Sequence, residues 1–246
     1  MVEKLSIVFM NADQVDPLFS ELQADIDQLR MTHLTSFFFQ GQENHDWDTR
    51  STLARRFPDL TSEQFAAKEQ DILGEIRKKY AGTLYESTAS DNRNNWYTLM
   101  QAQHLFEPTR LLDWTPDWIR SLFFVLEDGS QDEQDGAILY TPTNINIIDN
   151  EALDELDPFS LNRVVMICPT TYLSDEFPIQ LGTRRIYRQI GKFLVVPYSV
   201  CKVPLEETYD GYFGKIRIPY QNKKRLRAEL KRRGITVETM YQPKFS

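Results

Sequence analysis

Four polar side chains, three of which can carry charge, lie close together in the middle of the chain. His104, Thr109, Arg110 and Asp113 follow one another within one short segment. A histidine can accept a proton near neutral pH, an arginine can hold an anion, and a carboxylate can stabilise a positive charge. Because the histidine ends a segment with helical periodicity, we expect these groups to meet in one turn and form a candidate site.

The same residues also fit a turn that is fixed by its own polar contacts. A histidine at a helix end can bind the last carbonyl groups, and an arginine can pair with a carboxylate. The two interpretations differ in a way that coordinates can test. A functional site opens to solvent and leaves at least one polar group unsatisfied, whereas a structural network satisfies all of its polar atoms.

The composition predicts a folded protein without a membrane segment. The 246 residues are 41% hydrophobic and 12% aromatic, which provides apolar surface for a large core. No apolar run is long enough to cross a bilayer, and the first ten residues do not resemble a signal peptide. Cys168 and Cys201 have neither metal-ligand nor disulfide-scaffold spacing, so we expect a cytoplasmic protein without a bound metal.

Charge is unevenly distributed along the chain. The net charge of -8 disfavours unspecific attraction to nucleic acid. Basic residues are nevertheless concentrated in one late stretch, at Lys223, Lys224, Arg225, Arg227, Lys231, Arg232 and Arg233. Such a run is usually a solvated helix face, and a nucleic-acid-binding face is the weaker alternative.

Helices are expected to position the candidate residues in the first half of the chain. Apolar residues recur at steps of three and four in several segments. The predicted helices cover 13–30, 61–80, 96 to about 104, 115 to before Gly129, and 222–233. Thr61 with Gln64 predicts a capping box, Thr115 with Pro116 predicts a helix start, and Gly234 predicts a helix end.

Strands are expected mainly in the second half. Branched and aromatic residues bounded by Pro and Gly predict strands at 35–42, 136–141, 164–168, 192–198 and 214–218, with a strand-like tail after Gly234. The order of elements predicts an α+β fold, in which a helix-rich N-terminal half packs on a mostly antiparallel or mixed sheet from the second half. We expect one domain over 1–246, with a helical extension at 1–34 and a core at 35–243.

Several motifs occur together and in a fixed order. Gln103-His104 is followed by Pro108-Thr109-Arg110-Leu111-Leu112-Asp113-Trp114-Thr115, and this string resembles the signature of the FRG-domain family. Further resemblances follow the family's order in Phe39-Gln40-Gly41-Gln42, Ser51 to Arg56 and Arg185 to Phe193. Two residues depart from the family pattern. Gln40 stands in place of an arginine, which removes a positive charge, and Phe106 stands in place of a glycine, which adds a ring.

The resemblance implies a function and a set of site residues. FRG-domain proteins resemble parts of prokaryotic antiviral defence or toxin systems, and NAD-dependent ADP-ribosyltransferase-like chemistry is the activity implied, with NAD as substrate. His104, Asp113 and Gln189 are the implied catalytic residues, and His104, Arg110, Asp113 and Gln189 are expected to converge. The expected substrate-binding residues are Gln40, Gln42, Arg55, Gln103, Thr109, Arg110 and Arg185.

Two other functions remain open at this stage. The departures at Gln40 and Phe106 favour a catalytically inactive module that senses a nucleotide or another small molecule, or that acts as an adaptor for a protein partner. The basic stretch leaves a nucleic-acid-binding protein as the further alternative.

Overall fold

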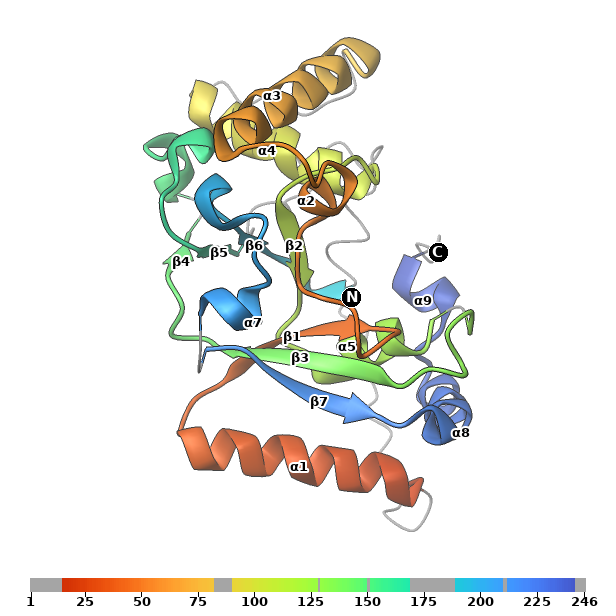
Figure 1. Cartoon of the computed structure of the whole chain (residues 1–246). Coiled ribbons are helices and arrows are strands. Elements are labelled where there is room, and N and C mark those ends of the chain that lie inside the picture. Colours follow the sequence, from red (N-terminus) through yellow and green to blue (C-terminus); the bar gives the residue numbers. More distant parts are fainter. Residues whose placement is uncertain are drawn as a thin grey trace, which may run out of the picture.

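The computed structural model describes residues 15–81, 90–127, 129–149, 151–168, 189–209 and 212–241. They form a single α+β domain, as the order of elements predicted (Figure 1). The helices are α1 (Pro17–His33), α2 (Thr52–Arg56), α3 (Ser62–Lys79), α4 (Asp91–His104), α5 (Trp118–Val125), α7 (Leu205–Thr208), α8 (Tyr220–Arg232) and α9 (Val237–Tyr241). The strands are β1 (Phe37–Gln42), β2 (Leu111–Trp114), β3 (Gly136–Pro142), β4 (Ile147–Ile148), β5 (Val165–Ile167), β6 (Lys192–Val195) and β7 (Gly214–Ile218).

The strands form two small sheets. One has the order β1-β3-β7, with antiparallel neighbours, and the other has the order β2-β6-β5-β4, in which β4 and β5 run parallel. Phe39 of β1 and Thr115, directly after β2, exchange two backbone hydrogen bonds of 2.7 and 2.8 Å. This bridged pair joins the sheets and brings the ends of β1 and β2 together.

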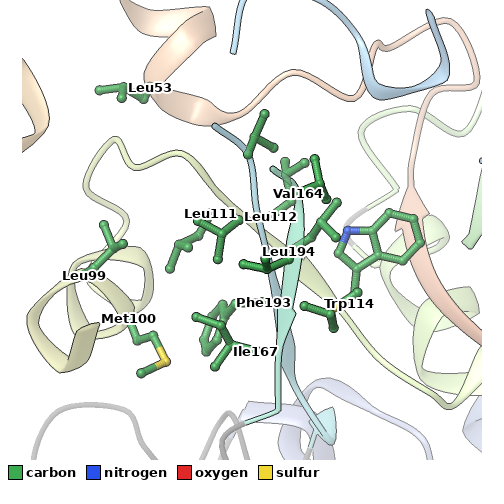
Figure 2. Packing of buried hydrophobic residues seen from close by; sticks show 14 of the residues in the cluster. Leu53, Leu99, Met100, Leu111, Leu112, Trp114, Val164, Ile167, Phe193 and Leu194 are labelled. Atoms are coloured by element: carbon green, nitrogen blue, oxygen red, sulfur yellow. The ribbon is translucent and has the colours of Figure 1, made fainter. Parts of the chain in front are cut away.

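Each face of the three-stranded sheet contacts a different hydrophobic core. Phe37 and Phe39 pack with residues of α1, α5 and α8. Phe38, one position along the strand, belongs to the larger core around the four-stranded sheet, α3 and α4. In Figure 1, α1 lies along one side of the three-stranded sheet and α3 and α4 lie at the opposite end of the molecule. Figure 2 shows the larger core, where Leu111, Leu112, Phe193 and Leu194 meet Leu99 and Met100 of α4.

Local signals explain where the helices begin and end. Thr61 and Gln64 form the predicted capping box of α3, and α4 ends at His104 as expected. The helix α4 begins earlier than predicted, because Ser90 accepts a hydrogen bond from the backbone of Arg93 and caps a polar first turn. Among the described residues, no helix is both long and apolar enough to cross a membrane.

Three sequence predictions were wrong. Thr115 does not cap α5, because its backbone pairs with Phe39; the side chain of Asp117 accepts from the backbone of Ile119 and provides the cap. The segment 111–114 is the strand β2 rather than part of a turn, because its backbone pairs with β6. The tail after Gly234 forms the helix α9, in which Met240 packs into the core beside α1 and α8.

Candidate functional site

A pocket of about 830 Å³ lies where the ends of β1, α4 and β2 meet. Residues 39–43 form one part of the wall, residues 103–104, 106–107 and 113–115 form another, and Gln189 and Gly191 close a third side. Trp47, Phe106 and Asp113 are exposed as well as pocket-lining, so the pocket opens to solvent. The size is typical of sites for small molecules and cofactors.

Most of the predicted site residues line this pocket. The residues concerned are Gln40, Gln42, Arg55, Gln103, His104, Asp113 and Gln189. The structure thus brings together three of the four residues expected to converge. Arg110 and Thr109 lie behind the pocket wall and are fully buried. Arg185 lies outside the described residues.

The alternation of β1 places Gln40 and Gln42 on the same face of the strand. Gln42 is 8% exposed, and its Nε2 donates to the carbonyl of Asp48 at 3.3 Å. Among the described residues, no group donates a hydrogen bond to the buried Oε1 of either Gln40 or Gln42. Two acceptors are therefore left unsatisfied on one wall of the pocket.

Between these glutamines, Gly41 allows β1 to lie directly on α5. A Cβ atom at this position would overlap the carbonyl oxygen of Ser121 and lie 2.9 Å from the Cβ of Phe124. Phe124 itself lines the pocket. The absence of a side chain at Gly41 therefore sets the position of the strand end that carries both glutamines.

A chain of hydrogen bonds orients the carboxylate of Asp113. Gln103 Nε2 donates to Asp113 Oδ2 at 2.7 Å, and the hydroxyl of Thr109 donates to Gln103 Oε1 at 2.5 Å. The backbone of Leu111 in turn donates to the same hydroxyl at 3.2 Å. Thr109 therefore holds the Gln103 amide with its nitrogen toward the carboxylate, while Asp113 remains exposed on β2.

His104 and Gln189 contribute polar groups from two further sides. His104 is half-buried at the end of α4, and its ring packs edge-on against Phe193 with centroids 5.6 Å apart. Gln189 is 9% exposed, and its Nε2 has no acceptor among the residues that the structure describes. The same holds for Nε1 of the pocket-lining Trp114. The pocket thus contains two buried donors in addition to the two buried acceptors.

Negative charge dominates the pocket wall. The lining includes the carboxylates of Glu43, Asp46, Asp48, Glu107, Asp113 and Glu127. Burial alone would raise the pKa of Asp48, but hydrogen bonds from the side chain and backbone of Arg50 hold that pKa below its ordinary value. Apart from Asp113, sequence reasoning overlooked these carboxylates, although Glu43 and Asp46 follow closely on the strand that was predicted to enter the site.

Arg55 is the cation among the lining residues. It donates to the carbonyl of Arg50 at 2.6 Å and to the hydroxyl of Thr52 at 3.4 Å. Within the described ranges, no carboxylate lies close enough to form an ion pair with it. Burial by the surrounding protein lowers the pKa of Arg55, and the neighbouring Asp48 partly opposes this effect. The Arg55 side chain reaches solvent in the pocket.

Arg110 belongs to a buried structural network. Its guanidinium lies 3.1 Å from the carboxylate of Glu69 and 4.1 Å above the ring of Tyr198. The other contacts of Glu69 are the backbone N–H of Arg110 at 2.8 Å and the hydroxyl of Tyr198 at 2.7 Å. For this residue the structure favours the ion-pair interpretation over the binding interpretation.

The basic residues of α8 are mostly used within the protein. Lys223 is buried and donates to the carbonyls of Glu43 and Gln131, and four arginines of this stretch form ion pairs. Those pairs join Arg225 with Asp16, Arg227 with Asp132, and Arg232 and Arg233 with Glu229. Phosphate contacts would have to compete with these pairs, so the geometry gives the nucleic-acid alternative little support.

One of three comparisons with known proteins found a match. No curated protein matches the chain, and no solved structure does. A family model described as the FRG domain matches residues 35–134. The matched residues include β1, α4 and β2, whose ends meet at the pocket. The chain therefore contains an FRG domain.

Proposed function

We propose that the pocket binds NAD and transfers its ADP-ribosyl group, as an effector of a prokaryotic defence or toxin system. The observation that carries the proposal is the assembly of Gln103 with Asp113, His104 and Gln189 around one pocket from separate segments of the chain. In the reaction, the bond between the ribose C1′ and the nicotinamide nitrogen breaks, and the nicotinamide leaves as a neutral ring with the bonding electrons. The acceptor then bonds to C1′ and loses a proton.

Asp113 has the chemistry required to stabilise the positive sugar. As the glycosidic bond breaks, charge develops on the ribose, and a fixed carboxylate lowers the energy of that state. The hydrogen bond from Gln103 fixes Asp113 without covering it. The acidic lining also suits the nicotinamide ring, which is positively charged in NAD.

The remaining groups suit the polar parts of the dinucleotide. Arg55 provides a positive charge for the diphosphate. Gln189 Nε2 and Trp114 Nε1 are buried donors for ribose hydroxyls or for the carboxamide oxygen. His104, at the end of α4, is the group that we assign to remove the proton from the acceptor.

Release of nicotinamide from NAD by the purified protein, together with transfer of labelled ADP-ribose to lysate proteins, tests this proposal. Asp113→Asn is expected to lower the rate about 10²- to 10³-fold, the range seen when one charge-stabilising group is removed. Asp59→Asn is the matched control, because Asp59 is exposed and lies outside the pocket wall. Its rate should equal that of the unmodified protein.

Two results would contradict the proposal. If the unmodified protein neither releases nicotinamide nor labels an acceptor, it is not an ADP-ribosyltransferase. If it binds NAD in calorimetry but releases no nicotinamide, the sensing alternative is correct. That alternative draws support from Gln103, because its hydrogen bond already occupies one oxygen of Asp113.

A further inference from the structure

At the β1 end of the pocket, two side-chain amides lie among carboxylates. We infer that Gln40 and Gln42, with the carboxylates of Glu43, Asp46 and Glu127, form a subsite for the guanidinium group of an arginine side chain. The binding part of this inference stands without the proposed function. Its second part, that this arginine is the acceptor of ADP-ribose, rests on the proposed function.

The orientation of the Gln42 amide is fixed by its surroundings. Its Nε2 donates to the Asp48 carbonyl, which can only accept, so turning the amide over would set two oxygens against each other. The Oε1 is therefore an acceptor, and it has no donor within the described part of the chain. A buried acceptor without a donor destabilises the empty site, and a ligand N–H group would remove that cost.

Gln40 adds a second acceptor two residues away. Residues two apart on a strand face the same way and are about 7 Å apart. Gln40 Oε1 is also buried and without a donor among the described residues. A guanidinium group carries five N–H donors in a planar fork, which can reach separate acceptors, whereas an ammonium group concentrates three donors at one atom. The spacing therefore favours guanidinium over ammonium.

Carboxylates surround these two amides. Glu43 follows Gln42 directly, and Asp46 lies in the loop that follows. Glu127 lies two residues after the end of α5, close in sequence to the Phe124 that lies against Gly41. The buried cation Lys223 lies outside the pocket wall and donates to backbone carbonyls of Glu43 and Gln131. The local charge thus attracts a cation and repels an anion.

As an acceptor, the arginine would complete a balanced transfer. One guanidinium nitrogen forms the bond to C1′ of the ribose as the bond to nicotinamide breaks. The nitrogen gives up one proton, which His104 can take, and the product guanidinium keeps its positive charge. The products are neutral nicotinamide, the modified arginine and one proton.

Binding of N-acetyl-arginine amide, measured by calorimetry without NAD, tests the subsite. The control ligand is N-acetyl-citrulline amide, which has nearly the same shape but no charge. We expect arginine to bind at least tenfold more tightly than citrulline, with an affinity that falls as salt rises. Equal affinities for the two ligands, or no binding of arginine, would overturn the inference.

Three variants locate the binding. Gln42→Leu removes the buried acceptor and should weaken arginine binding about tenfold, because hydrogen bonds to charged groups are the stronger ones. Gln40→Lys places a positive charge in the subsite and should abolish binding. Gln134→Leu is the control, because Gln134 is exposed and outside the pocket, and it should bind like the unmodified protein. Thermal unfolding of each variant shows that it is folded, and unchanged binding in both folded pocket variants would overturn the assignment.

The arginine subsite and the proposed transferase function can fail separately. If nicotinamide is released but arginine does not bind more tightly than citrulline, the subsite is wrong and the proposed function stands. If arginine binds as expected but no nicotinamide is released, the subsite stands and the proposed function fails. If both hold, an arginine peptide should be labelled, and labelling of a lysine peptide instead would overturn the acceptor assignment.

Discussion

Two groups of polar residues in the segment from Gln103 to Thr115 have different roles. Arg110 is fully buried and paired with Glu69, whereas Asp113, three residues later, is exposed in the pocket. Thr109 links the two groups, because it is buried but holds the pocket-facing Gln103. A compact motif thus contains both a structural network and a candidate site, and residue type alone does not separate them.

The largest expected effect on stability comes from the buried network around Arg110. Arg110→Met leaves the Glu69 carboxylate without its cation inside the protein, so we expect the free energy of unfolding to fall by about 3–5 kcal/mol. Urea denaturation measures the change. Arg225→Met is the control, because the Arg225 side chain is 56% exposed and its pair with Asp16 is worth less than about 1 kcal/mol. Similar losses in both variants would contradict the distinction between the two groups.

The next largest effect on stability is expected at Gly41, where β1 packs against α5. Gly41→Ala places a methyl group against the Ser121 carbonyl and should destabilise the protein by about 1–3 kcal/mol. Gly74→Ala provides the opposite case, because Gly74 lies within α3 with open space around it. Alanine there should stabilise the helix by about 0.5–1 kcal/mol. Thermal or urea unfolding distinguishes the two, and a neutral Gly41→Ala would mean that β1 is not held by this contact.

A smaller change in stability, this time an increase, is expected at Phe106 in the pocket opening. Phe106 is 77% exposed and has a φ of 60°, in the left-handed region. Phe106→Gly relieves that strain but increases the freedom of the unfolded chain, so we expect a net gain of about 0.5–1 kcal/mol. Phe106→Ala keeps the strained backbone and should be close to neutral. Equal stability of the glycine and alanine variants in urea denaturation would show that the backbone is not strained.

The smallest effect on stability is expected at Asp113. Asp113→Asn keeps the shape of the side chain and removes an exposed charge, so the free energy of unfolding should change by less than about 0.5 kcal/mol. The measurement is the same urea denaturation that is used for Arg110→Met. A loss of several kcal/mol would place Asp113 in the structural network and weaken its assignment to the pocket.

The sequence predicted the elements whose signals are local. The capping box of α3, the end of α4 and the strand β1 follow from periodicity and from capping residues. The strand β2 could not be found in this way, because Leu111 to Trp114 is short and its partner β6 lies about 80 residues later. The tail helix α9 is likewise stabilised by tertiary packing of Met240 rather than by a pattern of its own.

The candidate site was partly predictable for a similar reason. Three family-like motifs, one on β1, one directly after α4 and one directly before β6, suggested that Gln42, Asp113 and Gln189 meet. These residues do line one pocket. The burial of Arg110 was not predictable, because it depends on Glu69 and Tyr198, which come from distant segments. The acidic character of the pocket was also missed, because it arises from the sum of carboxylates on several elements.

The pairing of the strands determines whether residues 35–134 could fold without the rest of the chain. Residues 35–134 include β1 and β2, but the strands that pair with them, β3 and β6, come later in the chain. A polypeptide that ended at residue 134 would leave the backbone N–H and C=O groups of both strands as open edges, which favour aggregation. The FRG segment of this chain therefore depends on the C-terminal half for its folding, because β3 and β6 supply the pairing partners of both of its strands.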